Sequence, residues 1–152
     1  MSGSGYCELQ VDLNTGSKLY KVIIPEVEEN MDGLIPMNKL HSTIMYDASN
    51  PDVDPEINSD IYKARVTGVK MLGDPGSSWR SVALVLDSEA IQKRHKDLLE
   101  KGFKHSYPEL LIHVSIAYGE NAEVLFPVLE KLYKDGKLPE TVTLCNETWD
   151  LC

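Results

Sequence analysis

Several features that define large protein classes are absent from this 152-residue chain. No run of apolar residues approaches the roughly 20 that a membrane span needs, and no basic-then-apolar leader is found at its start. The three cysteines lack the even count and dense spacing of a disulfide scaffold, which fits a reducing compartment. We therefore expect a cytoplasmic protein that makes no contact with a membrane.

Positive charge is also in short supply, because 15 Lys and Arg stand against 24 Asp and Glu and give a formal net charge of −9. A protein that grips long nucleic acid usually offers a basic stripe, since neutralising phosphates supplies most of the binding energy. The only tight basic run, residues 93–96 (Lys-Arg-His-Lys), is interpreted as the solvated face of a helix. The composition argues against a long nucleic acid partner and favours a small phosphorylated ligand in a pocket.

A length of 152 residues predicts a single domain, 1–152, with an ordinary core. Residues 1–5 are set aside, because their Ser-Gly composition is typical of flexible or added sequence. Strands are predicted over residues 6–13, 40–46, 61–72, 79–86 and 111–118, one or two more within 140–150, and helices over 88–101 and 121–133. Residues 17–24 fit either a hairpin strand or a short helix that Pro25 ends. The elements predict an α+β fold with two antiparallel sheets that meet along a groove.

Two of the predicted strands share one pattern. Residues 40–46 read Leu-His-Ser-Thr-Ile-Met-Tyr, and residues 112–118 read Ile-His-Val-Ser-Ile-Ala-Tyr. The alternation of a strand places each histidine on the same face as the hydroxyl residue two positions later, His41 with Thr43 and His113 with Ser115. Two such pairs in one hydrophobic frame are hard to ascribe to unrelated strands.

This combination of side chains suits the cleavage of a phosphodiester. Histidine can both remove and supply a proton near neutral pH, since its unperturbed pKa is about 6.5. A hydroxyl beside it can donate to the phosphoryl oxygens, where charge accumulates in the transition state. A zinc site would need three or four clustered ligands, which neither motif has, and His95 and His105 fit neither pattern. We predict chemistry without metal or cofactor.

The paired motifs resemble those of the 2H phosphoesterase superfamily, which is named for two His-x-Ser/Thr strands. The resemblance implies a bilobal LigT-like fold with helices outside the two sheets, and catalytic roles for His41, Thr43, His113 and Ser115. Within the superfamily the chain looks most like the small phage anti-CBASS phosphodiesterases, over nearly its whole length. That closer likeness implies hydrolysis of 3′–5′ cyclic di- and trinucleotides, the alarms of bacterial immunity, by a phage protein in an infected cell.

Nucleobases need flat partners, and stacking on one ring contributes about 1–3 kcal/mol. The aromatic side chains with predicted access to a groove are Tyr6, Trp79, Tyr107 and Trp149. The resemblance implies that a tyrosine on an N-terminal strand, a tryptophan near the C-terminus and a nearby acid contact the base. Tyr6, Trp149 and Glu147 are the residues predicted for these roles, with Tyr20 as the alternative for the first.

Other functions stay open at this point. They are a 2′,3′-cyclic phosphodiesterase of RNA ends, a 2′–5′ oligoadenylate phosphodiesterase, a sponge that sequesters the nucleotide uncut, and a structural protein with accidental motifs. The acidic composition argues against RNA ends, and the retained pair of histidines argues against a sponge, because binding alone needs no acid and base. No obligate protein partner is predicted, and the motifs do not distinguish the acid from the base.

Overall fold

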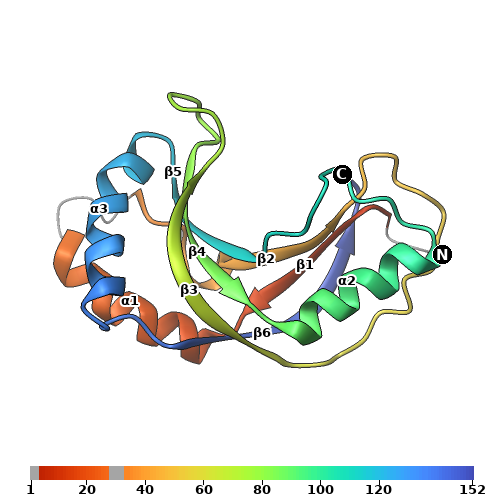
Figure 1. Ribbon diagram of the computed structural model, residues 1–152, viewed down its shortest axis with the longest axis horizontal. Coiled ribbons are helices and arrows are strands. Elements are labelled where there is room, and N and C mark those ends of the chain that lie inside the picture. The colour runs from red at the N-terminus through yellow and green to blue at the C-terminus, as the bar shows by residue number, and fades with distance from the viewer. Residues whose placement is uncertain (1–3, 28–32) are drawn as a thin grey trace.

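The computed structural model of the protein describes residues 4–27 and 33–152 (Figure 1). Its elements, in chain order, are β1 Tyr6–Val11, α1 Leu13–Val27, the short 3₁₀ helix η2 Met37–Lys39, β2 His41–Tyr46, β3 Tyr62–Leu72, β4 Ser81–Asp87, α2 Glu89–Lys101, β5 His113–Tyr118, α3 Glu120–Lys134 and β6 Thr141–Asp150. None of the described helices has the length and apolar character that crossing a bilayer requires.

The six strands form one antiparallel sheet in the order β2-β1-β6-β3-β4-β5. The α+β class is therefore confirmed, and the two predicted sheets are the two halves of this one. A short stretch of pairing between β3 and β6, from Tyr62 opposite Leu144 to Arg65 opposite Thr141, joins the halves. The two motif strands, β2 and β5, are the two edges of the sheet, and its curvature brings these edges into contact (Figure 1).

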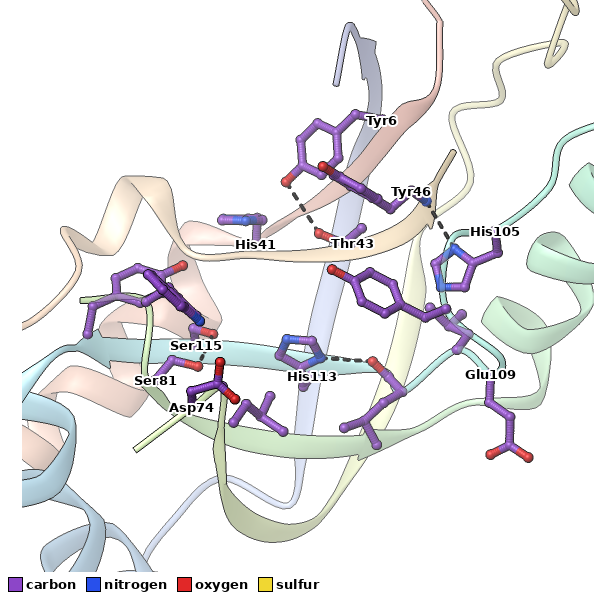
Figure 2. A pocket seen from close by; sticks show the side chains of 17 residues that line it. Tyr6, His41, Thr43, Tyr46, Asp74, Ser81, His105, Glu109, His113 and Ser115 are labelled. Atoms are coloured by element: carbon purple, nitrogen blue, oxygen red, sulfur yellow. Dashed lines mark hydrogen bonds between the residues drawn. The ribbon is translucent and has the colours of Figure 1, made fainter. Parts of the chain in front are cut away.

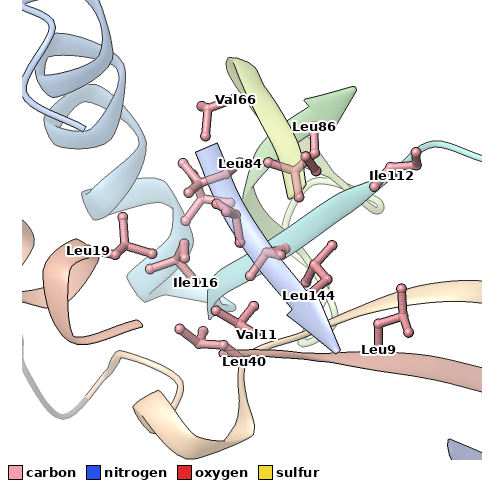
Figure 3. Close-up of a cluster of buried hydrophobic side chains, with 14 of the residues drawn as sticks. Leu9, Val11, Leu19, Leu40, Val66, Leu84, Leu86, Ile112, Ile116 and Leu144 are labelled. Carbon is pink, nitrogen blue, oxygen red and sulfur yellow. The ribbon is translucent and has the colours of Figure 1, made fainter. Parts of the chain in front are cut away.

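One continuous hydrophobic core holds both halves together (Figure 3). Leu9 and Val11 of β1 alternate with partly exposed polar residues, as expected for a strand with one buried face. Leu84 of β4 and Ile116 of β5 contribute from the other half of the sheet, and neither has any exposed surface. Because the same core lies under β2 and β5, the two motif strands are held on a common rigid support.

The segment whose sequence fits either a strand or a helix is a helix. It forms α1, which begins at Leu13, so β1 ends two residues earlier than predicted. Leu19, Ile23 and Val27 lie at helical spacing and are buried, and this apolar stripe decides the conformation. Pro25 lies inside the last turn of the helix and does not end it.

The helix predicted from residue 88 is confirmed, with Ser88 accepting a hydrogen bond from the Ile91 N–H at 3.2 Å and Gly102 following the last turn. Residues 1–3 of the segment set aside above, and residues 28–32, lie outside the described residues. Gly5, from the segment set aside above, is held to the rest of the fold by a hydrogen bond, in which its carbonyl oxygen accepts from the Asp47 N–H at 2.7 Å.

Candidate active site

A groove of about 690 Å³ lies between the two edges of the sheet (Figure 2). Its walls come from β1, β2, β4 and β5, from the turn between β3 and β4, and from the segment that leads into β5. Five aromatic side chains line it, namely Tyr6, Tyr46, Trp79, Tyr107 and Tyr118. The volume is within the range of pockets that bind small organic ligands.

All four motif residues line this groove. His41 and Thr43 are partly exposed and flank the fully buried Ser42 on β2, and His113 and Ser115 flank the buried Val114 on β5 in the same way. The predicted alternation is therefore confirmed, and the curvature of the sheet brings the two pairs to one cavity. Figure 2 shows His41 and His113 coming from two different strands.

A bulge occurs at the same place in both motif strands. The register of β2 on β1 skips Ile44, and the register of β5 on β4 skips Ile116. Strict alternation would place Tyr46 and Tyr118 on the face opposite the histidines. One extra residue reverses the alternation, so both tyrosines line the groove. The repeated frame in the sequence thus includes a repeated irregularity of the backbone.

The two histidines are oriented by the same type of hydrogen bond. His41 Nδ1 lies 3.0 Å from the Lys39 carbonyl oxygen, and His113 Nδ1 lies 2.8 Å from the Leu111 carbonyl oxygen. A carbonyl oxygen only accepts, so Nδ1 carries the proton in both rings. Nε2 is then the nitrogen that is available for chemistry at each histidine.

The Nε2 atoms of the two histidines differ in their surroundings. Glu8 Oε2 of β1 lies 3.3 Å from His41 Nε2, so both ring nitrogens of His41 face oxygen acceptors, the arrangement that suits an imidazolium. Burial lowers the pKa of His113, the charge of His41 lowers it further, and the Leu111 carbonyl opposes both effects. His113 therefore favours the neutral ring with a free lone pair on Nε2.

The two hydroxyl residues also have different partners. Thr43 Oγ1 donates to the Tyr6 hydroxyl at 3.3 Å, and the Tyr6 hydroxyl donates to Glu8 Oε2 at 2.9 Å. Burial raises the pKa of Tyr6 far above its usual range, so the phenol keeps its proton. On the other side, Ser115 Oγ donates to Ser81 Oγ at 3.3 Å. Both hydroxyls can turn toward an oxygen in the groove.

Sequence reasoning missed His105, which lines the groove from the segment before β5. The Tyr46 N–H donates to His105 Nδ1 at 3.0 Å, and the ring of His95 packs against it with centroids 4.7 Å apart. Burial, helped by His95, lowers the pKa of His105 to about 4, so the ring is neutral near pH 7. His105 lies outside any regular element, and no spacing in the sequence marks it.

Two of the predicted base contacts lie in the groove. Tyr6 is one, and Trp79, with 62% of its surface exposed, is the other. Tyr107 also lines the groove, on the side of Tyr46. Tyr20, the alternative to Tyr6, is buried in α1 with its hydroxyl donating to the Ile35 carbonyl, so it does not reach the groove.

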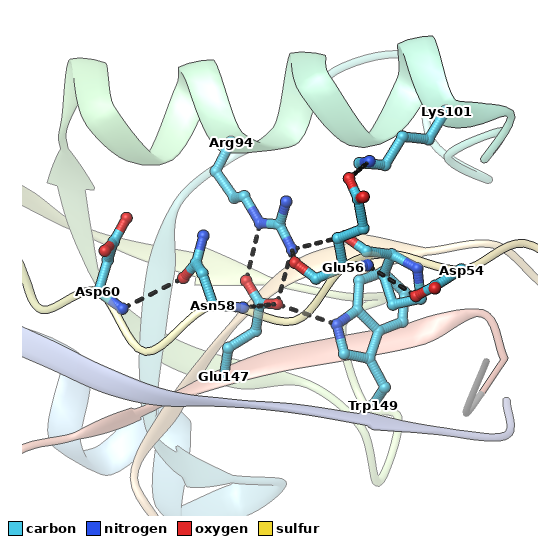
Figure 4. Close-up of polar contacts among 9 residues, drawn as sticks. Asp54, Glu56, Asn58, Asp60, Arg94, Lys101, Glu147 and Trp149 are labelled. Atoms are coloured by element: carbon cyan, nitrogen blue, oxygen red, sulfur yellow. Dashed lines mark hydrogen bonds and ion pairs between the residues drawn. The ribbon is translucent and has the colours of Figure 1, made fainter. Parts of the chain in front are cut away.

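Glu147 and Trp149 are not among the residues that line the groove. Figure 4 shows them beside Arg94 instead. The Glu147 carboxylate accepts from Arg94 of α2 at 2.9 and 2.7 Å and from Trp149 Nε1 at 3.1 Å. The indole is 8% exposed and stacks on Phe103. The two residues lie on the face of β6 that α2 covers, and their contacts there are those of a packed core.

The same cluster corrects the interpretation of residues 93–96. Lys93 and Lys96 are exposed, as expected, but Arg94 and His95 are 8% and 7% exposed. The sequence pattern could not reveal the acceptor for the arginine, because Glu147 lies 53 positions away. In the part of the chain that the structure describes, no three His, Cys, Asp or Glu residues are close enough to hold a metal ion.

The structure is similar to that of Usb1 from Kluyveromyces marxianus, with a TM-score of 0.52 and 13% identity over 96% of this chain and 92% of that one. This likeness concerns the fold, and the predicted 2H-phosphoesterase-like fold is thereby confirmed. The sequence is 29% identical to anti-CBASS protein Acb1 of Sphingomonas paeninsulae over an alignment of 126 residues, which covers 75% of this chain and 19% of that protein. The chain thus spans about a fifth of the length of that curated relative.

A family described as anti-CBASS protein Acb1 matches residues 6–149, which include both motifs and nearly all of the sheet. This match covers more of the chain than the alignment with the Sphingomonas paeninsulae protein does. The chain belongs to the Acb1 family of anti-CBASS proteins.

Proposed function

We propose that the protein is a phosphodiesterase that opens 3′–5′ cyclic di- and trinucleotides without a metal ion, and so removes the alarm of bacterial immunity in the cytoplasm of a phage-infected cell. One observation carries the proposal: two histidines with available Nε2 atoms, one suited to give a proton and one to take it, share a groove. Membership of the Acb1 family supports the anti-CBASS role.

The asymmetry of the pair assigns the first step. His113 Nε2 takes the proton of the ribose 2′-OH, and the freed oxygen attacks the neighbouring phosphorus in line. The bond from phosphorus to the 5′ oxygen breaks, and that oxygen takes the proton from His41 Nε2. The first product is a linear oligonucleotide with a 2′,3′-cyclic phosphate. With the roles exchanged, water opens this ring to a terminal monophosphate.

The two hydroxyls supply the electrostatic part of the reaction. Thr43 and Ser115 lie next to the histidines on the two edges and can donate to the non-bridging oxygens of the phosphate. Charge on these oxygens grows in the transition state, so a preorganised donor lowers the barrier. The strands hold the donors on the common core, which provides the orientation that the reaction needs.

The aromatic walls support a ligand that carries bases. Tyr46 and Tyr107 lie with ring centroids 5.9 Å apart at one side of the groove. Tyr118 pairs in register with Ser81 on β4, two residues after the exposed Trp79, so two further aromatic side chains line the other side of the groove. Rings at both sides suit a compact nucleotide with two bases that point away from each other.

The proposal is tested by incubating the protein with a panel of cyclic di- and trinucleotides in EDTA and measuring product masses. We expect linear products, first with a 2′,3′-cyclic phosphate and then with a monophosphate. A ring with 2′-deoxyribose at the cleaved linkage should resist, because it lacks the nucleophile. Tight binding of the rings without any cleavage would replace the enzyme by a sponge, and cleavage of 2′–5′ linkages alone would change the substrate.

A further inference from the structure

A second cavity of about 430 Å³ adjoins the groove, and we call it the polar pocket. Its lining residues are Glu8, Gln10, Asn38, Lys39, Leu40, His41, Asn146 and Thr148. We propose that the polar pocket binds the third nucleotide of a cyclic trinucleotide while the other two occupy the groove. The inference rests on the proposed function and names a binding site that this function alone does not require.

The position of the polar pocket connects it to the site of cleavage. His41 lines both cavities, and Glu8, which faces His41 Nε2 at 3.3 Å, lines the polar pocket. Both cavities lie on the face of β1 and β2 that carries Tyr6, Glu8 and Thr43. A ring whose phosphate lies beside His41 can therefore extend into the polar pocket without leaving this face.

The two cavities differ in the chemistry of their walls. The groove carries five aromatic side chains, of which two lie at one side and two at the other, whereas the polar pocket has no Tyr, Trp or Phe. Two stacked bases use the aromatic pairs, so a third base must be held elsewhere and by other means. Amide and hydroxyl side chains hold a base by hydrogen bonds to its edge, and the polar pocket offers three amides and one hydroxyl.

Two of these amides are already oriented. Asn146 Nδ2 donates to Gln10 Oε1 at 3.0 Å, which leaves Gln10 Nε2 as a donor and Asn146 Oδ1 as an acceptor. A donor beside an acceptor is what the edge of a nucleobase pairs with. Because the mutual bond holds both groups in place, less conformational freedom is lost when the base binds.

The backbone at Asn146 is unusual for the middle of a strand. Its φ is +54°, in the left-handed region, at the point where the pairing of β1 with β6 shifts register. Residues other than glycine are rarely found in this region, and asparagine tolerates it best. The bulge sets the Asn146 side chain on the pocket, and a costly conformation kept at a cavity is a common sign of a binding role.

Lys39 adds a positive charge to a lining whose other ionisable side chains, Glu8 and His41, face each other. An ammonium group is a suitable contact for the phosphate that follows a third nucleoside in the ring. The carbonyl of the same residue accepts from His41 Nδ1 at 3.0 Å. A nucleotide in the polar pocket thus contacts the residue that orients the proposed general acid.

The inference is tested by filling the polar pocket with a larger side chain and comparing the cleavage of a cyclic trinucleotide with that of a cyclic dinucleotide. Thr148 is exposed and lines only the polar pocket, and Thr141 is exposed on the same strand and lines neither cavity. We expect Thr148→Trp to lower kcat/KM for a cyclic triadenylate about tenfold or more, since it removes the space for one nucleotide. It should leave kcat/KM for a cyclic diadenylate within about twofold, and Thr141→Trp should change neither.

A second variant keeps the test decisive if the tryptophan disturbs folding. Asn146→Gly removes the amide and adopts φ +54° without strain, so it is expected to fold. We expect a loss of about tenfold for the trinucleotide alone, because up to two hydrogen bonds disappear. Equal losses for both rings, no loss for either, or a wild-type protein that cuts only the dinucleotide would overturn the inference. A wild-type protein that cuts neither ring would instead overturn the proposed function.

Discussion

The two halves of the groove carry the same motif in different surroundings. On the β2 side, Thr43, Tyr6, Glu8 and His41 form a continuous chain of polar contacts in which the Glu8 carboxylate joins Tyr6 to His41. On the β5 side, Ser115 donates to the hydroxyl of Ser81, and none of the described carboxylates forms an ion pair with His113. Two histidines with the same Nδ1 hydrogen bond thus differ in which state of Nε2 their surroundings favour.

This difference shows where the asymmetry of a repeated motif comes from. Within the motif strands the two sites match in spacing, in the bulge and in the orientation of the ring. The neighbouring strands differ, because β1 brings Glu8 beside His41 while β4 brings Ser81 beside Ser115. An acid and a base can therefore arise from two copies of one pattern.

The largest effect is expected from removing either histidine. His41→Ala and His113→Ala should each lower kcat/KM by about 10²–10⁴-fold, because each removes one proton transfer. The comparison predicts different pH profiles for what remains. His113→Ala should no longer show the fall in kcat/KM at low pH, because that fall reflects protonation of the base. His41→Ala should no longer show the fall at high pH, because that fall reflects deprotonation of the acid. Identical profiles for the two variants would contradict the assignment of roles.

In the wild-type protein, the pH at which kcat/KM falls on the acid side depends on the environment of His113. Burial lowers its pKa below the usual 6.5, so the neutral base persists to lower pH than it would in water. The acid limb of kcat/KM should therefore have its midpoint below about pH 6.5, and a midpoint above that value would speak against His113 as the base.

The hydroxyls should have the next largest effect. Thr43→Ala and Ser115→Ala should each cost at most about 10²–10³-fold in kcat, since each removes one donor to the phosphoryl oxygens. Thr43→Ser and Ser115→Thr are matched controls that keep the donor and should retain most of the activity. Circular dichroism and thermal unfolding would verify that the alanine variants fold. Unchanged kinetics in the double alanine variant would exclude the hydroxyls from the reaction.

Much of this site could be predicted from the sequence, because strand alternation is a local property. The four motif residues, their common faces and the strands that carry them follow from period-two spacing within seven residues. In the sequence, the bulges are visible only through the positions of Tyr46 and Tyr118. A register shift depends on the partner strand, and the pattern of one strand does not specify it.

The remaining features depend on contacts between distant parts of the chain. Glu147 and Trp149 fit an acid and an aromatic on one strand, but the face they share is covered by α2, where Arg94 lies. Glu8 and His105 had no motif to mark them, since their significance comes from His41 and Tyr46, more than 30 positions away. Side chains whose role depends on tertiary neighbours are those that spacing alone could not identify.

A smaller effect is expected from the carboxylate that distinguishes the two halves. Glu8→Gln should lower kcat/KM roughly tenfold, since a hydrogen bond to a charged partner is replaced by a neutral one. Asp150→Asn is a matched control that removes a charge from the end of β6, outside both cavities, and it should leave kcat/KM unchanged. Equal losses in the two variants would contradict a specific role for Glu8.

The smallest effect concerns His105, which joins the β2 side of the groove to the segment that leads into β5. Its pKa is about 4 in the folded protein and about 6.5 when unfolded, so the unfolded chain binds the proton more tightly. The stabilisation by the neutral ring is complete above about pH 6.5 and is lost as the pH falls toward 4. His105→Gln does not titrate and keeps an oxygen that can accept from the Tyr46 N–H. We therefore expect its free energy of unfolding, measured in urea at pH 7 and pH 4.5, to fall by about 2 kcal/mol less than that of the wild type. Equal losses in the two proteins would show that folding does not lower the pKa of His105.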